Sequence, residues 1–203
     1  MHARLISHPD PALTDGDLVL RPWRLGDVRA IASGCDDPDI ARFTRIPQPY
    51  ARRDARAFVV ESKRGWRTGS AAHFAMVESS CPKPIGSIGL SLDWHEHSAE
   101  AGYWVRREFR GRGRASAALR LVSRWAIEAL GLHRVALHAD VGNVASQHVA
   151  ENAGYTREGV LRSLLVLGGE PRDCFVYSLI PADLEAQTGV IRMQIDKKPF
   201  DDV

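Results

Sequence analysis

RREFRGRGRASAALRLVSRWAIEALG, residues 106–131, is the stretch that decides the fold. Its second part is predicted to be a long helix, because apolar side chains share one helical face at positions 115, 118, 119, 122, 125, 126 and 129, and the pattern stops at Gly131. Its first part is a loop of arginine and glycine. Because a helix N-terminus presents unpaired N–H groups and glycine lets an anion approach the backbone, this junction predicts a cradle for a diphosphate.

The arginines of this loop would add ionic contacts to a phosphate group. An arginine-glycine segment is also typical of solvated tails and of RNA-binding segments, and composition alone leaves these readings equal. The sequence on either side distinguishes them. An apolar strand is predicted before the loop and an amphipathic helix after it, which favours the diphosphate cradle.

Outward from this junction, we expect consecutive strands upstream and alternating strands and helices downstream. Upstream, three apolar runs at residues 73–78, 85–92 and 99–105 are separated by turn-rich segments and predict an antiparallel meander. Downstream, we expect a strand around residues 135–137, a helix over 143–153, and a hairpin of 159–167 with 174–180 around Gly168-Gly169. The second half therefore reads β-α-β-α-β-β.

The first part of the chain is predicted to be a strand at residues 17–23, a short helix capped by Asp27, broken helices over 36–50 and a helix over 52–67. We expect an N-terminal extension at residues 1–17, one folded domain over 18–181 and a polar C-terminal tail at 182–203.

The composition fits one globular domain. The chain has 203 residues, of which 44% are hydrophobic and 26% charged. No apolar run approaches the roughly 20 residues that span a bilayer, and the first ten residues lack a signal peptide's apolar stretch, so we expect a cytoplasmic protein with no membrane partner. A net charge of +2 gives no global attraction for nucleic acid. The three scattered cysteines predict free thiols rather than disulfides or zinc ligands.

Three motifs resemble the GNAT superfamily of acetyl-CoA-dependent N-acetyltransferases. Residues 110–115 read RGRGRA and match every specified position of the family's Q/R-x-x-G-x-G/A loop. Residues 100–105, EAGYWV, resemble the E-x-G-Y-W strand of the branch that contains ribosomal-protein N-terminal acetyltransferases. Residues 143–146, NVAS, followed by Gly154-Tyr155, resemble that branch's N-x-x-S…G-F/Y helix. The motifs occur in family order, and the resemblance runs from about Leu18 to Ile180.

The resemblance implies an α/β fold: a mixed, largely antiparallel central sheet of about seven strands, with helices on both faces and a cofactor cleft between two splayed strands. The backbone of Trp104 and Val105 would bind the pantetheine arm of acetyl-CoA, and the Val105 N–H would stabilise the oxyanion formed in acyl transfer. The diphosphate would be held by Arg110, Gly111, Arg112, Gly113, Arg114 and Ala115.

The resemblance also places Asn143 and Ser146 toward the cofactor, with Ser146 near the sulfur, where it would steady or protonate the leaving thiolate. Their spacing of three puts them on one helical face. The alternative is structural, because asparagine is a favoured N-cap and serine is common in a first helical turn. Tyr155 is expected in the core.

An amine must lose a proton before it attacks a thioester, and Glu100 is our candidate for the base. A strand glutamate is more often a solvated residue or an ion-pair partner. His138, on the strand beside the predicted cleft, is a reserve candidate. Two catalytic schemes of relatives do not transfer, because Leu165 and Ala150 stand where those relatives carry glutamate and tyrosine.

No metal site is expected, since His95-Glu96-His97 lies in a predicted turn without a third ligand. The acceptor amine would be bound by the variable loops 36–50 and 168–172, and the acidic Asp36, Asp37 and Asp39 would attract its positive charge. We expect direct attack in a ternary complex on a primary amine, with a protein N-terminus favoured by the strand and helix motifs. The alternatives are a small amine, such as an aminoglycoside or polyamine, and a non-catalytic binding domain; family analogy allows a homodimer.

Overall fold

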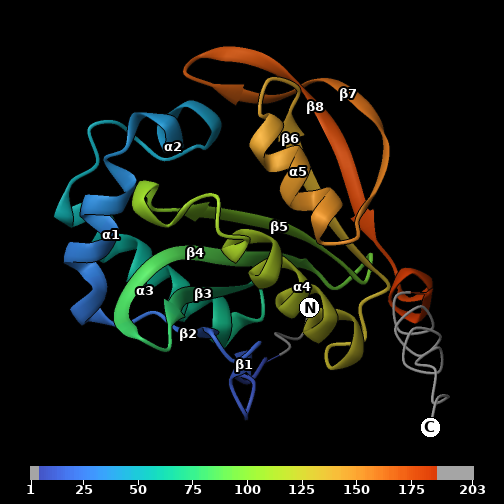
Figure 1. Cartoon of the computed structure of the whole chain (residues 1–203), viewed down its shortest axis with the longest axis horizontal. Coiled ribbons are helices and arrows are strands. Elements are labelled where there is room, and N and C mark those ends of the chain that lie inside the picture. Colours follow the sequence, from blue (N-terminus) through green and yellow to red (C-terminus); the bar gives the residue numbers. More distant parts are fainter. Residues whose placement is uncertain (1–4, 187–203) are drawn as a thin grey trace, which may run out of the picture.

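The computed structural model describes residues 5–186, in which eight strands form one sheet in the order β1-β2-β3-β4-β5-β6-β8-β7 (Figure 1). The strands are β1 (Leu13–Thr14), β2 (Leu18–Pro22), β3 (Ala71–Glu78), β4 (Cys81–Asp93), β5 (Ser98–Val105), β6 (Arg134–Asp140), β7 (Thr156–Leu167) and β8 (Glu170–Leu179). The helices are η1 (Leu25–Asp27), α1 (Val28–Cys35), α2 (Pro38–Phe43), α3 (Arg52–Thr68), η2 (Arg107–Phe109), α4 (Arg114–Glu128) and α5 (Val144–Asn152). The predicted α/β class and element order are confirmed.

The sheet is largely antiparallel, and its single parallel pair among the described residues joins β5 to β6. This pair is short: it runs from Ser98↔Arg134 to Ala101↔Leu137. Both strands continue beyond it, β5 to Val105 and β6 to Asp140, without pairing to each other. The two strands therefore part at their carboxyl ends, as the predicted cleft between splayed strands requires.

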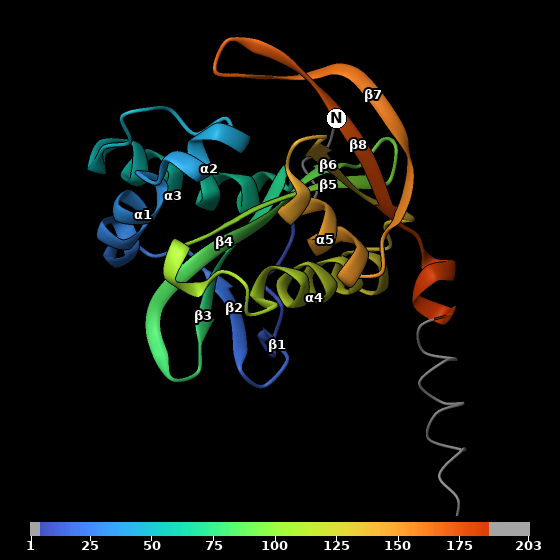
Figure 2. The same cartoon turned by 45° about the horizontal axis from the view of Figure 1, so that its top comes forward.

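Side chains of β5 alternate between two cores, because successive strand residues point to opposite faces. Ala99, Ala101 and Val105 lie in a cluster with residues of α4, while Trp104 packs with Trp23 in a second cluster that includes residues of α1 and α3. Figure 2 shows α1, α2 and α3 on one side of the sheet and α4 and α5 on the other. We call these the α3 face and the α4 face.

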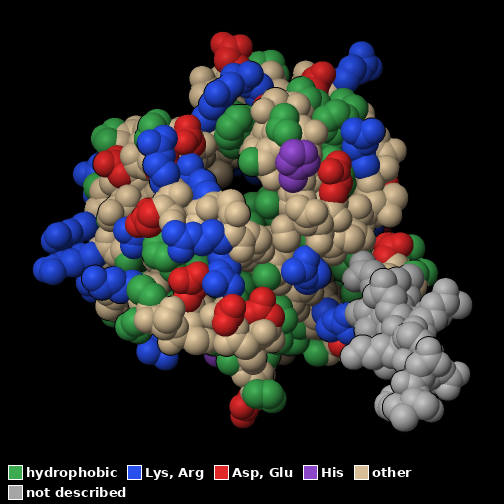
Figure 3. All heavy atoms as spheres, in the orientation of Figure 1, with side chains coloured by type: hydrophobic (Ala, Val, Ile, Leu, Met, Phe, Trp, Pro, Cys, Tyr) green, Lys and Arg blue, Asp and Glu red, His purple; other side chains and the backbone are tan. Residues whose placement is uncertain are grey.

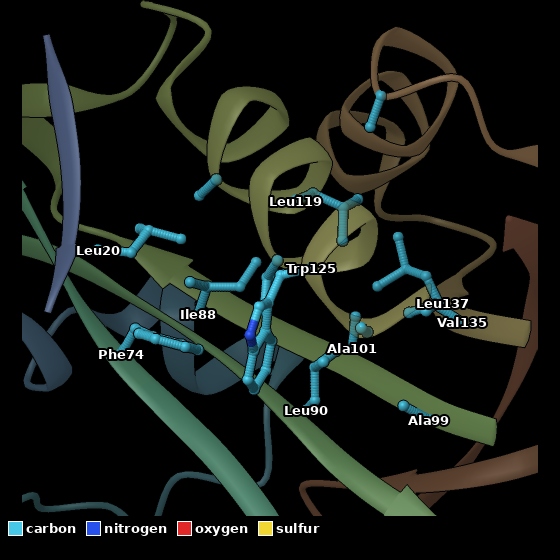
Figure 4. Close-up of a cluster of buried hydrophobic side chains, with 14 of the residues drawn as sticks. Leu20, Phe74, Ile88, Leu90, Ala99, Ala101, Leu119, Trp125, Val135 and Leu137 are labelled. Carbon is cyan, nitrogen blue, oxygen red and sulfur yellow. The ribbon is translucent and has the colours of Figure 1, made fainter. Parts of the chain in front are cut away.

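Trp125 is the largest side chain that α4 contributes to its core. Figure 4 shows it beside Ile88 and Leu90 of the sheet, and its ring stands edge-on to Phe74 at 5.7 Å. Burying a tryptophan side chain contributes at most about 4 to 6 kcal/mol of transfer free energy. This packing fixes α4, and with it the loop at its N-terminus, against the sheet.

The structure has one strand more than the seven expected. The additional strand is β1, which pairs with β2 through Leu13↔Leu20 and Thr14↔Val19 and lies in the stretch we had assigned to the N-terminal extension. At the other end, residues 181–186 are helical and Leu184 is buried. The rest of the expected tail lies outside the described residues.

The prediction for Asp27 was wrong in part. Asp27 occupies the N-cap position of α1, but its side chain makes no capping hydrogen bond there. Its two carboxylate oxygens instead accept from the guanidinium of Arg21, each at 2.8 Å, and one also accepts from the Arg24 backbone N–H. A bidentate bond between two charged groups is stronger than a single carboxylate bond to a backbone N–H, so Asp27 ties η1 back to β2.

Candidate functional site

Residues 110–115, which we call the cofactor loop, turn the chain from η2 into the start of α4. Gly111 and Gly113 have φ angles of +72° and +70°, a left-handed conformation that favours glycine. A Cβ built on either glycine would meet nothing within 4 Å, so the space in front of the loop is open. The first helical bond of α4 runs from Ala117 N–H to Gly113 O, which leaves the preceding N–H groups available to an anion.

The arginines of the cofactor loop have different surroundings. Arg110 donates through Nε to Val105 O at 2.9 Å and pairs with Asp37 and Asp39. Arg114 donates to Glu78 Oε1 at 2.7 Å. Arg112 is exposed and lies over the Phe109 ring at 5.5 Å. Arg110 and Arg114 therefore brace the loop, whereas Arg112 is the loop arginine that projects into solvent.

Val105 presents its backbone to the gap between β5 and β6. Arg106 N–H donates to Ile85 O, and because hydrogen-bonded pairs alternate along an antiparallel ladder, Val105 is a non-hydrogen-bonded position against β4. Its N–H and C=O therefore face the side from which β6 has departed. The C=O accepts from Arg110, and the N–H is directed into the gap, where the sequence predicted a donor for the acyl group.

On the α4 face, a pair of hydroxyl groups bridges β5 and α5. Tyr103 Oη lies 2.8 Å from Ser146 Oγ. Burial raises the pKa of Tyr103 to about 12, so the phenol is protonated at neutral pH. Sequence reasoning missed Tyr103 as a functional residue, although it stands in the E-x-G-Y-W motif. The sequence contained a signal for this placement: Tyr103 lies two residues after Ala101 on a strand, so both side chains point to the same face, the α4 face.

Asn143 has the structural role that we named as the alternative, and its contact with the cofactor stays a prediction. Its side-chain oxygen accepts from the Ser146 N–H at 3.1 Å, so it is the N-cap of α5. The cap fixes the first turn of α5 and thereby the place of Ser146 beside Tyr103. Tyr155 lies in the core, 5% exposed, with its hydroxyl 2.6 Å from that of Ser123.

On the α3 face, Glu100 pairs with His138 across the last part of the parallel ladder. Their Oε1 and Nδ1 atoms are 3.2 Å apart, and the Glu100 side chain is 51% exposed. The hydrogen bond from His138 holds the pKa of Glu100 below its usual value, outweighing the effect of partial burial. Glu100 is therefore ionised at neutral pH, and the reserve candidate His138 is its partner.

A pocket of about 240 Å³ opens on the same face beside Glu100. Thr44, just after α2, and Phe58 of α3 form one side of it, and His73, Gly89, Gly102 and Trp104 are among the sheet residues that form the rest. Trp104 thus points its side chain to the α3 face, away from α4, so that its contribution to a cofactor site would come through its backbone. Figure 3 shows the molecule hollowed between α2 and α5, with basic side chains nearby.

His73 is a pocket residue that sequence reasoning missed. Its Nδ1 would lie 2.1 Å from a Cβ on Gly89, so the imidazole occupies the room left by that glycine. Burial lowers the pKa of His73, which favours the neutral ring. The sequence contained a signal for this role, because His73 is a polar residue at an inward-facing position of the apolar run 73–78.

Two of the three acidic residues expected to attract the acceptor are already paired within the protein. Asp37 and Asp39 contact Arg107 and Arg110. The other expected acceptor loop, residues 168–172, forms the tip of the β7–β8 hairpin, with Gly168 and Gly169 at positive φ. Figure 1 shows this hairpin arching over the sheet toward α2.

Within residues 5–186, no group of three or more His, Cys, Asp or Glu side chains could hold a metal ion, and no helix is long and apolar enough to cross a membrane.

The open helix N-terminus, the glycine loop and the parted strands fit a diphosphate joined to an extended arm. Residues 17–156 match the family described as "Acetyltransferase (GNAT) domain". The chain belongs to the GNAT acetyltransferase family. It is therefore an N-acetyltransferase that uses acetyl-CoA as the acetyl donor.

Relatives of this GNAT enzyme include proteins named for ribosomal substrates. It is 41% identical to "Putative ribosomal N-acetyltransferase YdaF" of Bacillus subtilis over 103 residues, which are 50% of this chain and 56% of YdaF. Two solved structures share its fold with a TM-score of 0.76. Mycobacterium smegmatis RimJ in complex with CoA-disulfide is 23% identical over 82% of this chain and 83% of RimJ. The microcin C7 self-immunity acetyltransferase MccE in complex with acetyl-CoA and AMP is 21% identical over 84% of this chain and 99% of MccE.

Proposed function

We propose that this enzyme acetylates the N-terminal amine of a protein. The observation that carries the proposal is the size and place of the pocket beside Glu100. At about 240 Å³, it is smaller than the roughly 300 to 1,000 Å³ of sites that enclose drug-sized ligands, such as an aminoglycoside. An extended N-terminus needs room for only one or two residues. The likeness to YdaF, named as a ribosomal N-acetyltransferase, supports the same choice.

The acetyl group passes directly from acetyl-CoA to the amine while both are bound. The cofactor loop and Ser146 belong to the α4 face, the pocket belongs to the α3 face, and the parted ends of β5 and β6 lie between them. No cysteine lines the pocket, and Cys35 and Cys174 are buried thiols with raised pKa values. These thiols are unsuited to carry the acetyl group, which supports direct transfer with both substrates bound.

Glu100 is the base in this proposal. Its carboxylate is ionised at neutral pH, partly exposed and part of the pocket wall, so it takes a proton from the acceptor ammonium, directly or through water. His73, kept neutral by burial, adds no positive charge that would repel the ammonium. The Val105 N–H, directed into the gap, stabilises the negative charge that develops on the acetyl oxygen.

Ser146 and Tyr103 assist the leaving group on the other face. Ser146 Oγ–H donates to the departing sulfur, and the Tyr103 hydroxyl, protonated at neutral pH, donates in turn to Ser146. The proton that the thiolate acquires thereby passes through two hydroxyl groups, and Tyr103 recovers from solvent the proton that it gives up to Ser146. Arg112 and the backbone N–H groups of the cofactor loop hold the diphosphate, while Arg110 and Arg114 hold the loop.

A substrate panel tests the acceptor. Acetyl-CoA-dependent thiol release is measured with peptides that carry free N-termini, the same peptides with blocked N-termini, spermidine and an aminoglycoside. We expect the highest kcat/KM with free N-terminal peptides and none with blocked ones. A higher kcat/KM for spermidine or the aminoglycoside would show that the acceptor is a small amine and not a protein. If the chain binds acetyl-CoA but acetylates none of these amines, a non-catalytic binding domain is favoured.

A further inference from the structure

The acidic residues at the start of α2 are attached to the cofactor loop. Arg110 places one guanidinium nitrogen 2.8 Å from Asp37 and another 3.2 Å from Asp39. Arg107 reaches the same two carboxylates at 3.9 Å and 3.0 Å. The four side chains form one network that joins residues about 70 positions apart in the sequence, as the separations of 71 and 73 for the Arg110 bonds show.

Asp37 has a central place in this network. One of its carboxylate oxygens accepts from the Asp39 N–H and caps α2, while the other pairs with Arg110. Its side chain is 12% exposed and that of Arg110 is 32% exposed, so water screens this pair less than it screens the outer pair of Arg107 and Asp39. The same guanidinium of Arg110 also donates to Val105 O. Arg110 is thus held on two sides by groups that are not part of the loop.

We infer that Asp37 and Asp39 are positioning residues for the acetyl-CoA site, acting through Arg110 and Arg107. Their carboxylates fix the arginine that anchors the first position of the cofactor loop, and the loop in turn aims its backbone N–H groups at the diphosphate. The inference rests on the assignment of residues 110–115 to acetyl-CoA. It also explains why two acids stand beside a site for an anion: they bind the arginines, and their negative charge is neutralised there.

Helix α2 extends this role to the acceptor side. Asp37 caps its N-terminus, and Thr44, which follows its C-terminus, lines the pocket beside Glu100 and donates its hydroxyl to Ile40 O at 2.7 Å. One short helix therefore connects the cofactor loop to the wall of the acceptor pocket. A change at the Asp37–Arg110 pair is expected to alter both substrate sites.

The direction in which the Kd for acetyl-CoA changes distinguishes a positioning role of Asp37 from a purely electrostatic one. In Asp37→Asn, the loss of a negative charge near the diphosphate would by itself tighten acetyl-CoA binding, whereas a loop released from its anchor binds it more weakly. We expect the Kd for acetyl-CoA, measured by calorimetry, to rise roughly tenfold, the scale of a lost bidentate or charge-assisted contact. Asp36→Asn is the matched control: it removes the same charge from an exposed neighbour for which the described residues provide no ion pair, and its Kd should change less than about twofold.

A double-mutant cycle identifies the partner. If Asp37 acts through Arg110, then Asp37→Asn combined with Arg110→Gln should bind acetyl-CoA no more weakly than Arg110→Gln alone. Asp39→Asn, at a more exposed position, should show a smaller rise in Kd. This variant tests the same inference if Asp37→Asn does not fold. Unchanged or tighter binding in both aspartate variants, or additive losses in the cycle, would overturn the inference. Gly113→Glu tests the loop assignment separately, because it should abolish binding whether or not the aspartates matter.

Discussion

Tyr103 and Ser146 place their hydroxyl groups 2.8 Å apart, although one residue lies on β5 and the other on α5. If they act as one proton path to the sulfur, Tyr103→Phe and Ser146→Ala should each lower kcat by about 10- to 100-fold, at the low end of general acid catalysis. The double variant should be no slower than the slower single variant. The measurement is kcat at saturating acetyl-CoA and acceptor.

A second hydroxyl pair offers the control for that experiment. Ser123 and Tyr155 lie 2.6 Å apart within the core. Ser123→Ala should lower the free energy of unfolding by about 1 to 3 kcal/mol, because it leaves the buried phenol unpaired, yet kcat at a temperature where the variant is folded should be unchanged. Additive losses in the Tyr103 and Ser146 cycle, or an equal loss of kcat in Ser123→Ala, would contradict the proton path.

Glu100→Gln tests the base. Turnover should fall by roughly a hundredfold, the usual scale for a lost general base, while the Kd for acetyl-CoA stays near the parent value. The deficit should shrink as pH rises, because more of the acceptor is then already deprotonated. Glu96→Gln, in the exposed turn between β4 and β5, is the matched control. Near-parental turnover at every pH would show that Glu100 is an ion-pair residue only.

His138→Gln tests the same carboxylate through its pKa. Because His138 is the main cause that lowers the pKa of Glu100, the variant should raise that pKa toward its ordinary value. A raised pKa means that the carboxylate is protonated, and lost as a base, at a higher pH. We therefore expect the acidic limb of kcat/KM to begin at a higher pH in the variant than in the parent. Superimposable profiles would mean that Glu100 does not limit the acidic limb.

Gly113→Glu tests the cofactor loop. The substitution puts a side chain and a negative charge where the diphosphate is expected, at a position with φ of +70°. Acetyl-CoA at a hundred times its Kd should stabilise the parent by about 2.7 kcal/mol through mass action, and the melting temperature should rise accordingly. The variant should fold but show no such rise. If millimolar acetyl-CoA leaves the melting temperature of the parent unchanged, the assignment of the loop is contradicted.

Two glycines of the β4–β5 ladder should differ in their tolerance of alanine. A Cβ on Gly86 would lie 2.4 Å from Trp104 O, a backbone atom that cannot move alone, whereas a Cβ on Gly102 would meet nothing within 4 Å. Gly86→Ala should cost about 1 to 3 kcal/mol of unfolding free energy through overpacking. Gly102→Ala should change it by less than about 1 kcal/mol. Urea denaturation measures both, and equal effects would contradict this packing.

Local patterns in the sequence determined most of the fold. The stripe from position 115 to 129 predicted α4, which the structure places at Arg114–Glu128, and the three apolar runs predicted the meander of β3, β4 and β5. Periodicity and turn residues act between close neighbours in the chain, so they can be read directly. The two-residue strand β1 was missed, because a strand that short has no period to detect.

The partners of the charged and polar side chains were decided only by the tertiary structure. The sequence identified the residues at Asp37 and Arg110 but assigned one to the acceptor and the other to the diphosphate, whereas the fold pairs them at 2.8 Å. Likewise, Glu100 gained His138 and Ser146 gained Tyr103 from other elements. The physical reason is range: a helix or strand forms from its own neighbours, but an ion pair or a hydroxyl bridge exists only where the packing of the sheet and helices brings distant residues together.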